Sequence, residues 1–214
     1  MWMGQGVPVS QAVVRVPQEE RTRVMRQRLL DATVELVAER GYAATTTVQV
    51  AERAGVSRGA LLHHFPSKND LVIAAVEQVM TNRYDDLRAA AETMTGARTR
   101  RVLQMLADHF TSPFFMAALD LWVAARTDDG LRAEVYPLER EVGRQTHQLT
   151  VELLGADESL PGVREMIQAT LDLVRGLGLA SALSADTDRR NRILDQWAAV
   201  LDTALLKDVL KEKP

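Results

Sequence analysis

A short segment in the first third of the chain combines long polar side chains with small residues. It reads Arg58-Gly59-Ala60, and His63 follows about one helical turn later. A helix that enters the major groove of DNA must be thin where it meets the bases, so that one or two long side chains reach the base edges. Arg58 carries a fork of donors that suits guanine O6 and N7 or a phosphate. The segment therefore predicts a DNA-reading helix.

Residues on both sides of this segment suit the DNA backbone. Lys68 stands at the start of another predicted helix, where a phosphate would meet an ammonium and unpaired backbone amides. Thr46 and Thr47 can offer hydroxyls and amides at the start of an earlier helix, and one of them should cap it. Further arginines, at positions 21, 23, 26 and 28, can add a less specific attraction, although nearby acidic residues neutralise part of it.

Two very short helices, expected at 48–54 and 58–65, must position these groups. Gly55-Val56-Ser57 separates them. Gly55 supplies the positive φ of a tight turn, Val56 can enter the core between the helices, and Ser57 can cap the second one. This order is typical of a helix-turn-helix unit, in which Leu61 and Phe65 of the second helix would point inward.

The rest of the chain predicts helices as well. β-branched residues alternate only briefly, around 45–50, whereas helical periodicity recurs everywhere else. Gly41 is expected to end the first helix as a left-handed cap. We therefore predict an all-α protein with nine helices. Their expected ranges are 18–40, 48–54, 58–65, 68–91, 100–110, 114–126, 129–154, 163–183 and 188–210.

The domain organisation follows from the change in helix length. We expect a flexible tail over 1–17, a helix-turn-helix DNA-binding domain over 18–72, and a helical ligand-binding and dimerisation domain over 73–214. Basic residues outnumber acidic ones between positions 15 and 71, although the whole chain has a net charge of −3. This distribution places cations where a polyanion could bind.

Composition excludes several classes of protein. With 214 residues, 46% of them apolar, the chain can build a real core, and without cysteine it has neither disulfides nor thiolate metal sites. Neither a membrane span nor a secretion signal is predicted, so we expect a cytoplasmic protein. No nucleophile elbow, nucleotide loop or metalloprotease motif occurs, and we expect no enzyme activity, no cofactor and no metal.

The segment from Gly41-Tyr42 through Gly55-Val56-Ser57-Arg58-Gly59 to Phe65-Pro66-Ser67-Lys68 resembles the TetR family of bacterial transcriptional regulators. The resemblance is dense over about 20–75, and the helix count extends it to the whole chain. It implies a homodimeric, ligand-responsive repressor that binds double-stranded DNA, and it favours a structural role for His64. The expected DNA-binding residues are Thr46, Thr47, Ser57, Arg58, Gly59, Ala60, Leu62, His63 and Lys68.

Leu62 departs from the family pattern, which usually has tyrosine at this position. A tyrosine hydroxyl would reach a phosphate, and leucine cannot. Leu62 therefore implies either a weaker hold on the backbone or an apolar contact with a thymine methyl group.

The larger helical part offers a candidate pocket for a small-molecule effector. The helix expected at 114–126 is apolar almost all round and should run through the middle of this part. Asp120 and Arg126 are its polar exceptions, and Phe114 and Met116 are further apolar candidates. A row of Met and aromatic residues can equally be plain core. The expected lining residues are Met105, His109, Phe115, Leu119, Trp122, Arg126 and His147.

The last two helices carry apolar stripes that can join two copies of the chain into a four-helix bundle. Gly176 and Gly178 would allow close helix approach. The alternative is that the stripes belong to the core of a single chain, whereas the resemblance favours a dimer. The expected interface residues are Leu173, Leu177, Ile193, Trp197, Val200 and Leu201.

Two functions from different classes fit these patterns. The first is a repressor released from a near-palindromic operator by a small molecule. The second is a helical adaptor or ligand-binding protein that no longer binds DNA, which Leu62 and the acidic balance allow. A repressor should lose DNA affinity steeply as salt rises, and an adaptor should not bind duplex DNA.

Overall fold

The structure is a computed structural model that describes residues 18–92 and 98–209. Nine α-helices and no strands make up these residues, so the all-α prediction is confirmed. The helices are α1 (Gln18–Ala44), α2 (Thr47–Ala54), α3 (Arg58–His64), α4 (Lys68–Glu92), α5 (Arg98–Phe110), α6 (Pro113–Ala125), α7 (Asp129–Leu154), α8 (Val163–Ala180) and α9 (Thr187–Val209).

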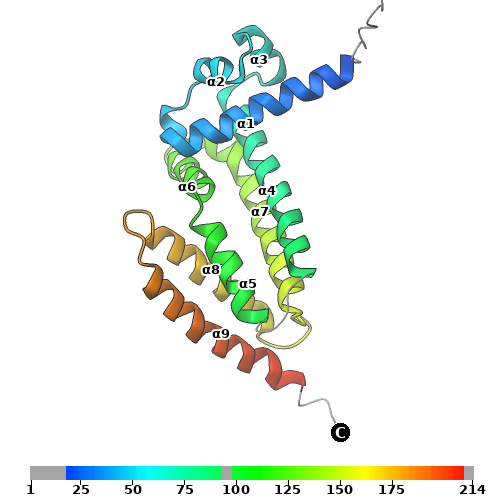
Figure 1. The fold of residues 1–214 in the computed structure, drawn as a ribbon, viewed down its shortest axis with the longest axis vertical. Helices are drawn as coiled ribbons and strands as arrows, with labels where there is room; N and C mark the ends of the chain where they lie inside the picture. Colours follow the sequence, from blue (N-terminus) through cyan, green and yellow to red (C-terminus); the bar gives the residue numbers. More distant parts are fainter. Residues whose placement is uncertain (1–17, 93–97, 210–214) are drawn as a thin grey trace, which may run out of the picture.

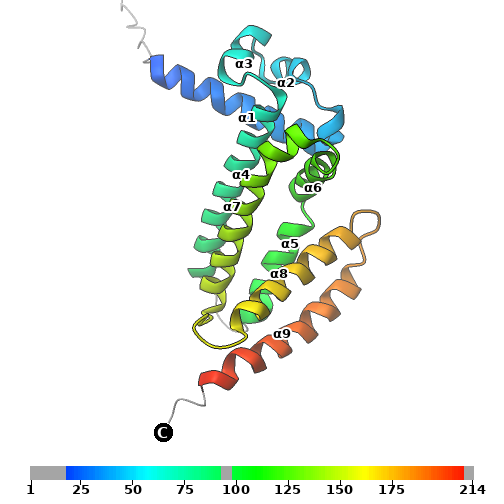
Figure 2. The ribbon, with the colours of Figure 1, turned by 180° about the vertical axis from the view of Figure 1, so that it is seen from behind.

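The helices form a small head at one end of a longer body. Figure 1 shows α2 and α3 at the top, with α1 lying across beneath them and α4 descending from the head into the body. In the body, α4 and α7 run side by side, and α8 and α9 lie next to α5, as the view from behind also shows (Figure 2). The two shortest helices therefore stand at the tip of the molecule.

The head has its own apolar core. Leu29, Leu30 and Leu36 of α1 pack with Val50 of α2 and Leu61 of α3, and all five side chains are nearly or fully buried. Burying a leucine side chain contributes about 2 kcal/mol. This core holds two helices of only 8 and 7 residues, which would not be stable alone in water.

Head and body share a second cluster of buried side chains. Val37 of α1 and Val72 of α4 pack against Ala117 and Leu121 of α6 and Leu131 of α7. The border expected between 72 and 73 falls inside the continuous helix α4. A movement of α6 would therefore displace α1 directly.

Most expected helix ends lie within two residues of the observed ones, and two points differ. Helix α8 ends at Ala180, where the last amides bond back to Leu177 and Gly178, three residues before the predicted end. Gly41 has the predicted positive φ (77°), but its ψ of 168° is not that of a left-handed cap, and one more helical turn follows to Ala44. None of the described helices is long and apolar enough to cross a membrane.

Candidate nucleic-acid interface and ligand cavity

Side-chain caps fix the start of both helices at the tip. Thr46 accepts a hydrogen bond from the amide of Gln49, whose side chain accepts one from the Thr46 amide in return. Ser57 accepts from the amide of Ala60 at 3.1 Å. Between the helices Gly55 adopts the left-handed conformation (φ 67°, ψ 36°) that a side chain would disfavour. Thr46, rather than Thr47, is therefore the cap, and the predicted turn at Gly55 is confirmed.

The outer side of α3 is exposed. Arg58, Gly59 and His63 are exposed and Leu62 has 38% of its surface exposed, whereas Leu61 is fully buried. Phe65, just after the helix, is also buried, so the inward direction predicted for Leu61 and Phe65 is confirmed. A helix with a flat Gly59-Ala60 surface between longer side chains can approach the floor of a groove closely.

Lys68 joins the end of α1 to the start of α4. Its Nζ donates a hydrogen bond to the carbonyl oxygen of Tyr42 at 2.6 Å and lies 4.0 Å from the centre of the Tyr42 ring. Partial burial lowers the pKa of Lys68. The Tyr42 hydroxyl in turn donates to Asn69 Oδ1 at 2.7 Å. Sequence reasoning missed this tether, which uses one of the three donors of the ammonium and leaves the others for a phosphate.

Some of the other cations near the head already have partners. Arg23 pairs with Glu20, and the guanidinium of Arg26 lies 5.2 Å from the centre of the Phe65 ring. Arg53 of α2 bridges Glu35 and Glu39 of α1. These exposed pairs each contribute little to stability, and they reduce the positive charge that the head could offer to DNA.

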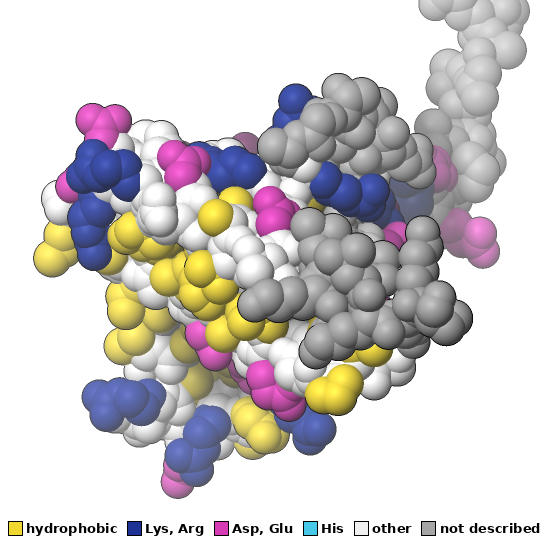
Figure 3. All heavy atoms as spheres, turned by 90° about the horizontal axis from the view of Figure 1, so that it is seen from below, with side chains coloured by type: hydrophobic (Ala, Val, Ile, Leu, Met, Phe, Trp, Pro, Cys, Tyr) yellow, Lys and Arg dark blue, Asp and Glu magenta, His cyan; other side chains and the backbone are white. Residues whose placement is uncertain are grey.

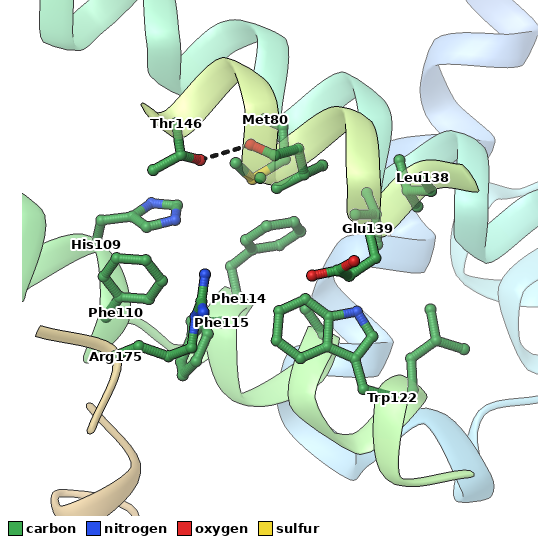
Figure 4. Close-up of a pocket in the computed structure, with 15 residues that line it drawn as sticks. Met80, His109, Phe110, Phe114, Phe115, Trp122, Leu138, Glu139, Thr146 and Arg175 are labelled. Carbon is green, nitrogen blue, oxygen red and sulfur yellow. Dashed lines mark hydrogen bonds between the residues drawn. The ribbon is translucent and has the colours of Figure 1, made fainter. Parts of the chain in front are cut away.

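A cavity lies in the body between α4, α5, α6, α7 and α8. About 580 Å³ of space between its walls is not filled by atoms, a volume that includes the part open to solvent. The walls are mainly apolar and aromatic (Figure 4). The aromatic rings meet edge to face, with centroids 5.0 Å apart for Phe110 and Phe115 and 6.0 Å for Phe115 and Trp122.

Four polar side chains break this apolar lining, those of His109, Glu139, Thr146 and Arg175. His109 and Arg175 lie on one side of the cavity and Glu139 on the other, next to Trp122 (Figure 4). Burial lowers the pKa of His109 to about 4, with a smaller contribution from the charge of Arg83. His109 is therefore a neutral imidazole at pH 7. A few polar groups in an apolar cavity are what fixes a ligand's orientation.

The sequence and fold match known regulators. The family model for bacterial regulatory proteins of the tetR family matches residues 29–75. The HTH-type transcriptional regulator CymR from Pseudomonas putida is 30% identical over 187 residues, which cover 84% of this chain and 90% of that protein. The chain belongs to the TetR family of transcriptional regulators. The predicted resemblance is thus confirmed, and α2, the turn and α3 are the DNA-binding helix-turn-helix unit of a TetR-family protein.

Solved structures show the same fold. A transcriptional regulator from Rhodococcus sp. Rha1 aligns with a TM-score of 0.64 at 23% identity over 84% of this chain and 96% of that one. A putative regulator from Saccharomonospora viridis, solved in complex with choline, aligns with a TM-score of 0.61 at 20% identity over 84% and 96%. The expectation of a regulator rather than an enzyme agrees with membership of the TetR family.

The cavity of this TetR-family chain brings together some of the residues predicted for the pocket. His109, Phe115 and Trp122 line the cavity, as does Phe114, whereas Met105, Leu119, Arg126 and His147 do not. His147 instead pairs with Glu158 in the α7–α8 connection at 2.6 Å. Arg126 follows the end of α6 and lines a separate surface groove with Tyr136.

Helix geometry explains why Leu119 and Met105 lie outside this cavity. Leu119 lies on a different side of α6 from the lining residues Ala118 and Trp122, and Met105 lies one turn of α5 before His109. Asp120 is exposed, and its carboxylate faces Gly41, where a Cβ atom would lie 2.6 Å from Oδ2.

Arg175 and Glu139 are the functional candidates that sequence reasoning missed. Arg175 lies on α8 among apolar residues. A charged residue within an apolar stripe needs a partner, and this pattern could have indicated its role. Glu139 lies in a helix with many acidic and basic residues, so its pattern carried no such signal.

The expected interface residues divide into two groups. Leu177 and Leu201 are buried in the core of the chain itself, as the single-chain alternative expected. Val200 has 45% of its surface exposed, and Leu173, Ile193 and Trp197 are half-buried. The Trp197 indole donates to Thr170 Oγ1 at 3.0 Å, which ties α9 to α8.

The side of the body formed by α8 and α9 has an exposed apolar area. Viewed from below, hydrophobic side chains gather on the left, the side that α8 and α9 occupy in Figure 1 (Figure 3). Leu179 has 58% and Leu183 100% of its surface exposed, in addition to Val200. Large apolar side chains so exposed often mark a surface that a partner covers.

Proposed function

We propose that this TetR-family regulator is a homodimeric repressor that holds a near-palindromic operator and releases it when a small molecule fills the body cavity. The outward face of α3 carries the proposal. There Arg58, Gly59, Leu62 and His63 are exposed, and the buried Leu61 anchors the helix from behind.

In this proposal Arg58 contacts a base edge or a phosphate, and Leu62 meets a thymine methyl group. Thr46, Thr47 and the starts of both helices bind the sugar-phosphate backbone, and so does Lys68 through its remaining donors. Ser57 holds the first turn of α3 in place. We assign 18–72 to DNA binding and 73–214 to ligand binding and pairing.

A second copy of the chain is needed because one 7-residue helix reads too few bases for useful specificity. Two copies related by a dyad would place their α3 helices about 34 to 36 Å apart, in successive major grooves. Exposed Leu179 and Val200 on α8 and α9 support pairing through these helices. The half-buried Ile193 and Leu173 would complete the contact.

The effector would cause release of the operator through α6 and α4. Phe115 and Leu121 of α6 line the cavity, and Leu121 also packs in the cluster that contains Val37 of α1. A ligand that prefers another position of α6 would therefore change the position of the heads. The shift can be no larger than the difference in ligand affinity between the two arrangements.

The test selects duplexes bound by the full-length protein from a random pool and measures their affinity over a salt series. The protein should select a near-palindrome and lose affinity steeply as salt rises. Arg58→Ala should weaken binding and relax the preference at one base pair per half-site. Arg144→Ala, in the exposed part of α7 far from the head, is the control and should bind like the parent. Unchanged affinity and preference in Arg58→Ala would remove Arg58 as a reader, and a protein that is monomeric at micromolar concentrations would contradict the repressor.

A further inference from the structure

We propose that the body cavity binds a small monocarboxylic acid with an apolar, aromatic-sized body, and that Arg175 and His109 hold its carboxylate. The inference rests on the proposed function in one respect, because it takes this cavity as the effector site. It adds the charge and shape of the ligand and the residues that recognise them.

Arg175 presents an unused pair of donors. Its Nη1 pairs with Asp172 Oδ1 on the same helix at 3.2 Å, whereas its Nε is buried and has no hydrogen-bond partner among the described residues. A guanidinium nitrogen can only donate. The edge formed by Nε and Nη2 matches the two oxygens of a carboxylate. A buried donor without an acceptor is costly, and a bound carboxylate would remove that cost.

His109 supplies a second donor beside this edge. Only 5% of its surface is exposed, and its Nδ1 is also buried without a partner in the part of the chain that the structure describes. Burial lowers its pKa to about 4, so the ring is neutral at pH 7 and one nitrogen carries a proton to donate. His109 and Arg175 both lie against Phe110, at 5.0 Å between ring centroids and 5.5 Å from the guanidinium carbon to the centroid.

The rest of the lining suits an apolar ligand body. Phe114, Phe115 and Trp122 face the cavity together with Met80 and Leu121 (Figure 4). The free edges and faces of such rings can pack against a further flat apolar group. A ligand with polar groups along its length would lose its hydration there without compensation.

Glu139 limits the ligand to a single negative charge. Its carboxylate lies across the cavity from Arg175, near Trp122 (Figure 4), and no ion pair between Glu139 and Arg175 occurs. A second carboxylate at that end would be repelled. A cation between Glu139 and the rings is the competing possibility, but it would place a positive charge opposite Arg175 and leave both buried donors unpaired.

The experiment measures ligand binding to the full-length protein by calorimetry, without DNA. The probes are 3-phenylpropionate, the neutral 3-phenylpropanamide and the cation phenethyltrimethylammonium, which share an aromatic body and differ in charge. We expect the acid to bind roughly 10- to 100-fold more tightly than the amide, since hydrogen bonds to a charged group are the stronger kind. The cation should bind most weakly.

Three variants test which side chains recognise the carboxylate of the ligand. Arg175→Gln should reduce the preference for acid over amide to within about twofold, and Glu139→Gln should strengthen binding of the acid by removing a like charge. Arg164→Gln is the matched control, because Arg164 is an exposed arginine on the same helix that pairs with Glu158. It should bind all three probes like the parent. Thermal unfolding of each variant distinguishes lost binding from lost folding.

The outcomes are distinct. Tighter binding of the cation or the amide than of the acid, no acid binding at millimolar concentrations, or an unchanged preference in folded Arg175→Gln would each overturn the inference. Operator release is measured separately. Acid binding that leaves DNA affinity unchanged would support the inference and contradict the proposed release mechanism. Operator binding by a protein that does not bind the acid would contradict the inference and leave the proposed DNA binding supported.

Discussion

Gly178 of α8 lies directly against the carbonyl group of Phe110 at the end of α5. A Cβ atom on Gly178 would overlap the Phe110 carbonyl oxygen and lie 2.9 Å from its carbonyl carbon. Two helices can approach this closely only where one has no side chain. This contact places Phe110, and His109 beside it, at the wall of the cavity.

The first prediction compares two glycines on α8. Gly178→Ala should lower the free energy of unfolding by about 1–3 kcal/mol or more, because backbone would have to move to admit the methyl group. Gly176→Ala should stabilise the chain by about 0.5–1 kcal/mol, since Gly176 has open space around its Cβ position and alanine is the better helix former. Urea unfolding at several protein concentrations separates folding from pairing. Equal effects of the two substitutions would contradict the close contact.

The second prediction concerns the cap of α2. Thr46→Ala removes the acceptor for the Gln49 amide and should cost about 1 kcal/mol of stability. Thr46→Ser keeps the hydroxyl and should restore most of it. Chemical unfolding followed by circular dichroism measures both variants. If the serine variant were as unstable as the alanine variant, the methyl group of Thr46 would matter more than its hydroxyl.

The third prediction concerns pH. His109 has a pKa lowered from 6.5 to about 4 in the folded chain, so the unfolded chain binds its proton first as pH falls. The contribution of His109 to the free energy of unfolding is complete above pH 6.5. That free energy then falls by about 3 kcal/mol in all as the pH drops from 6.5 towards 4. His109→Leu should remove this part of the acid sensitivity in unfolding measured across that range. His63→Gln, at an exposed position on α3, should leave the sensitivity as it is.

The fourth prediction separates two roles of Lys68. Lys68→Met removes the hydrogen bond to the Tyr42 carbonyl and should lower the free energy of unfolding by about 1–2 kcal/mol. If the ammonium also binds a phosphate, the variant should lower the slope of log affinity against log salt by about 0.9 per Lys68 contact. An unchanged slope in a destabilised variant would make Lys68 a tether only.

The sequence alone determined the fold class and the helix-turn-helix unit, because both depend on local signals. Gly55 needs its positive φ and Ser57 its amide partner within three residues, so neighbours along the chain decide them. The same holds for most helix ends, where caps and helix breakers act locally. Two helix ends departed from the prediction: α1 continues past Gly41 to Ala44, and α8 ends early because Ser181 bonds back to the last turn before the apolar pattern ends.

Tertiary structure decided the cavity and the joint between head and body. Arg175 comes to lie near His109 only because α8 crosses α5 at Gly178, a contact between residues far apart in the chain. Likewise, His147 and Glu158 satisfy each other across the end of α7. Lys68 bonds to the Tyr42 carbonyl, 26 residues earlier. From the sequence, a polar side chain on an apolar helix is expected to need a partner. The packing of the helices determines which group that partner is.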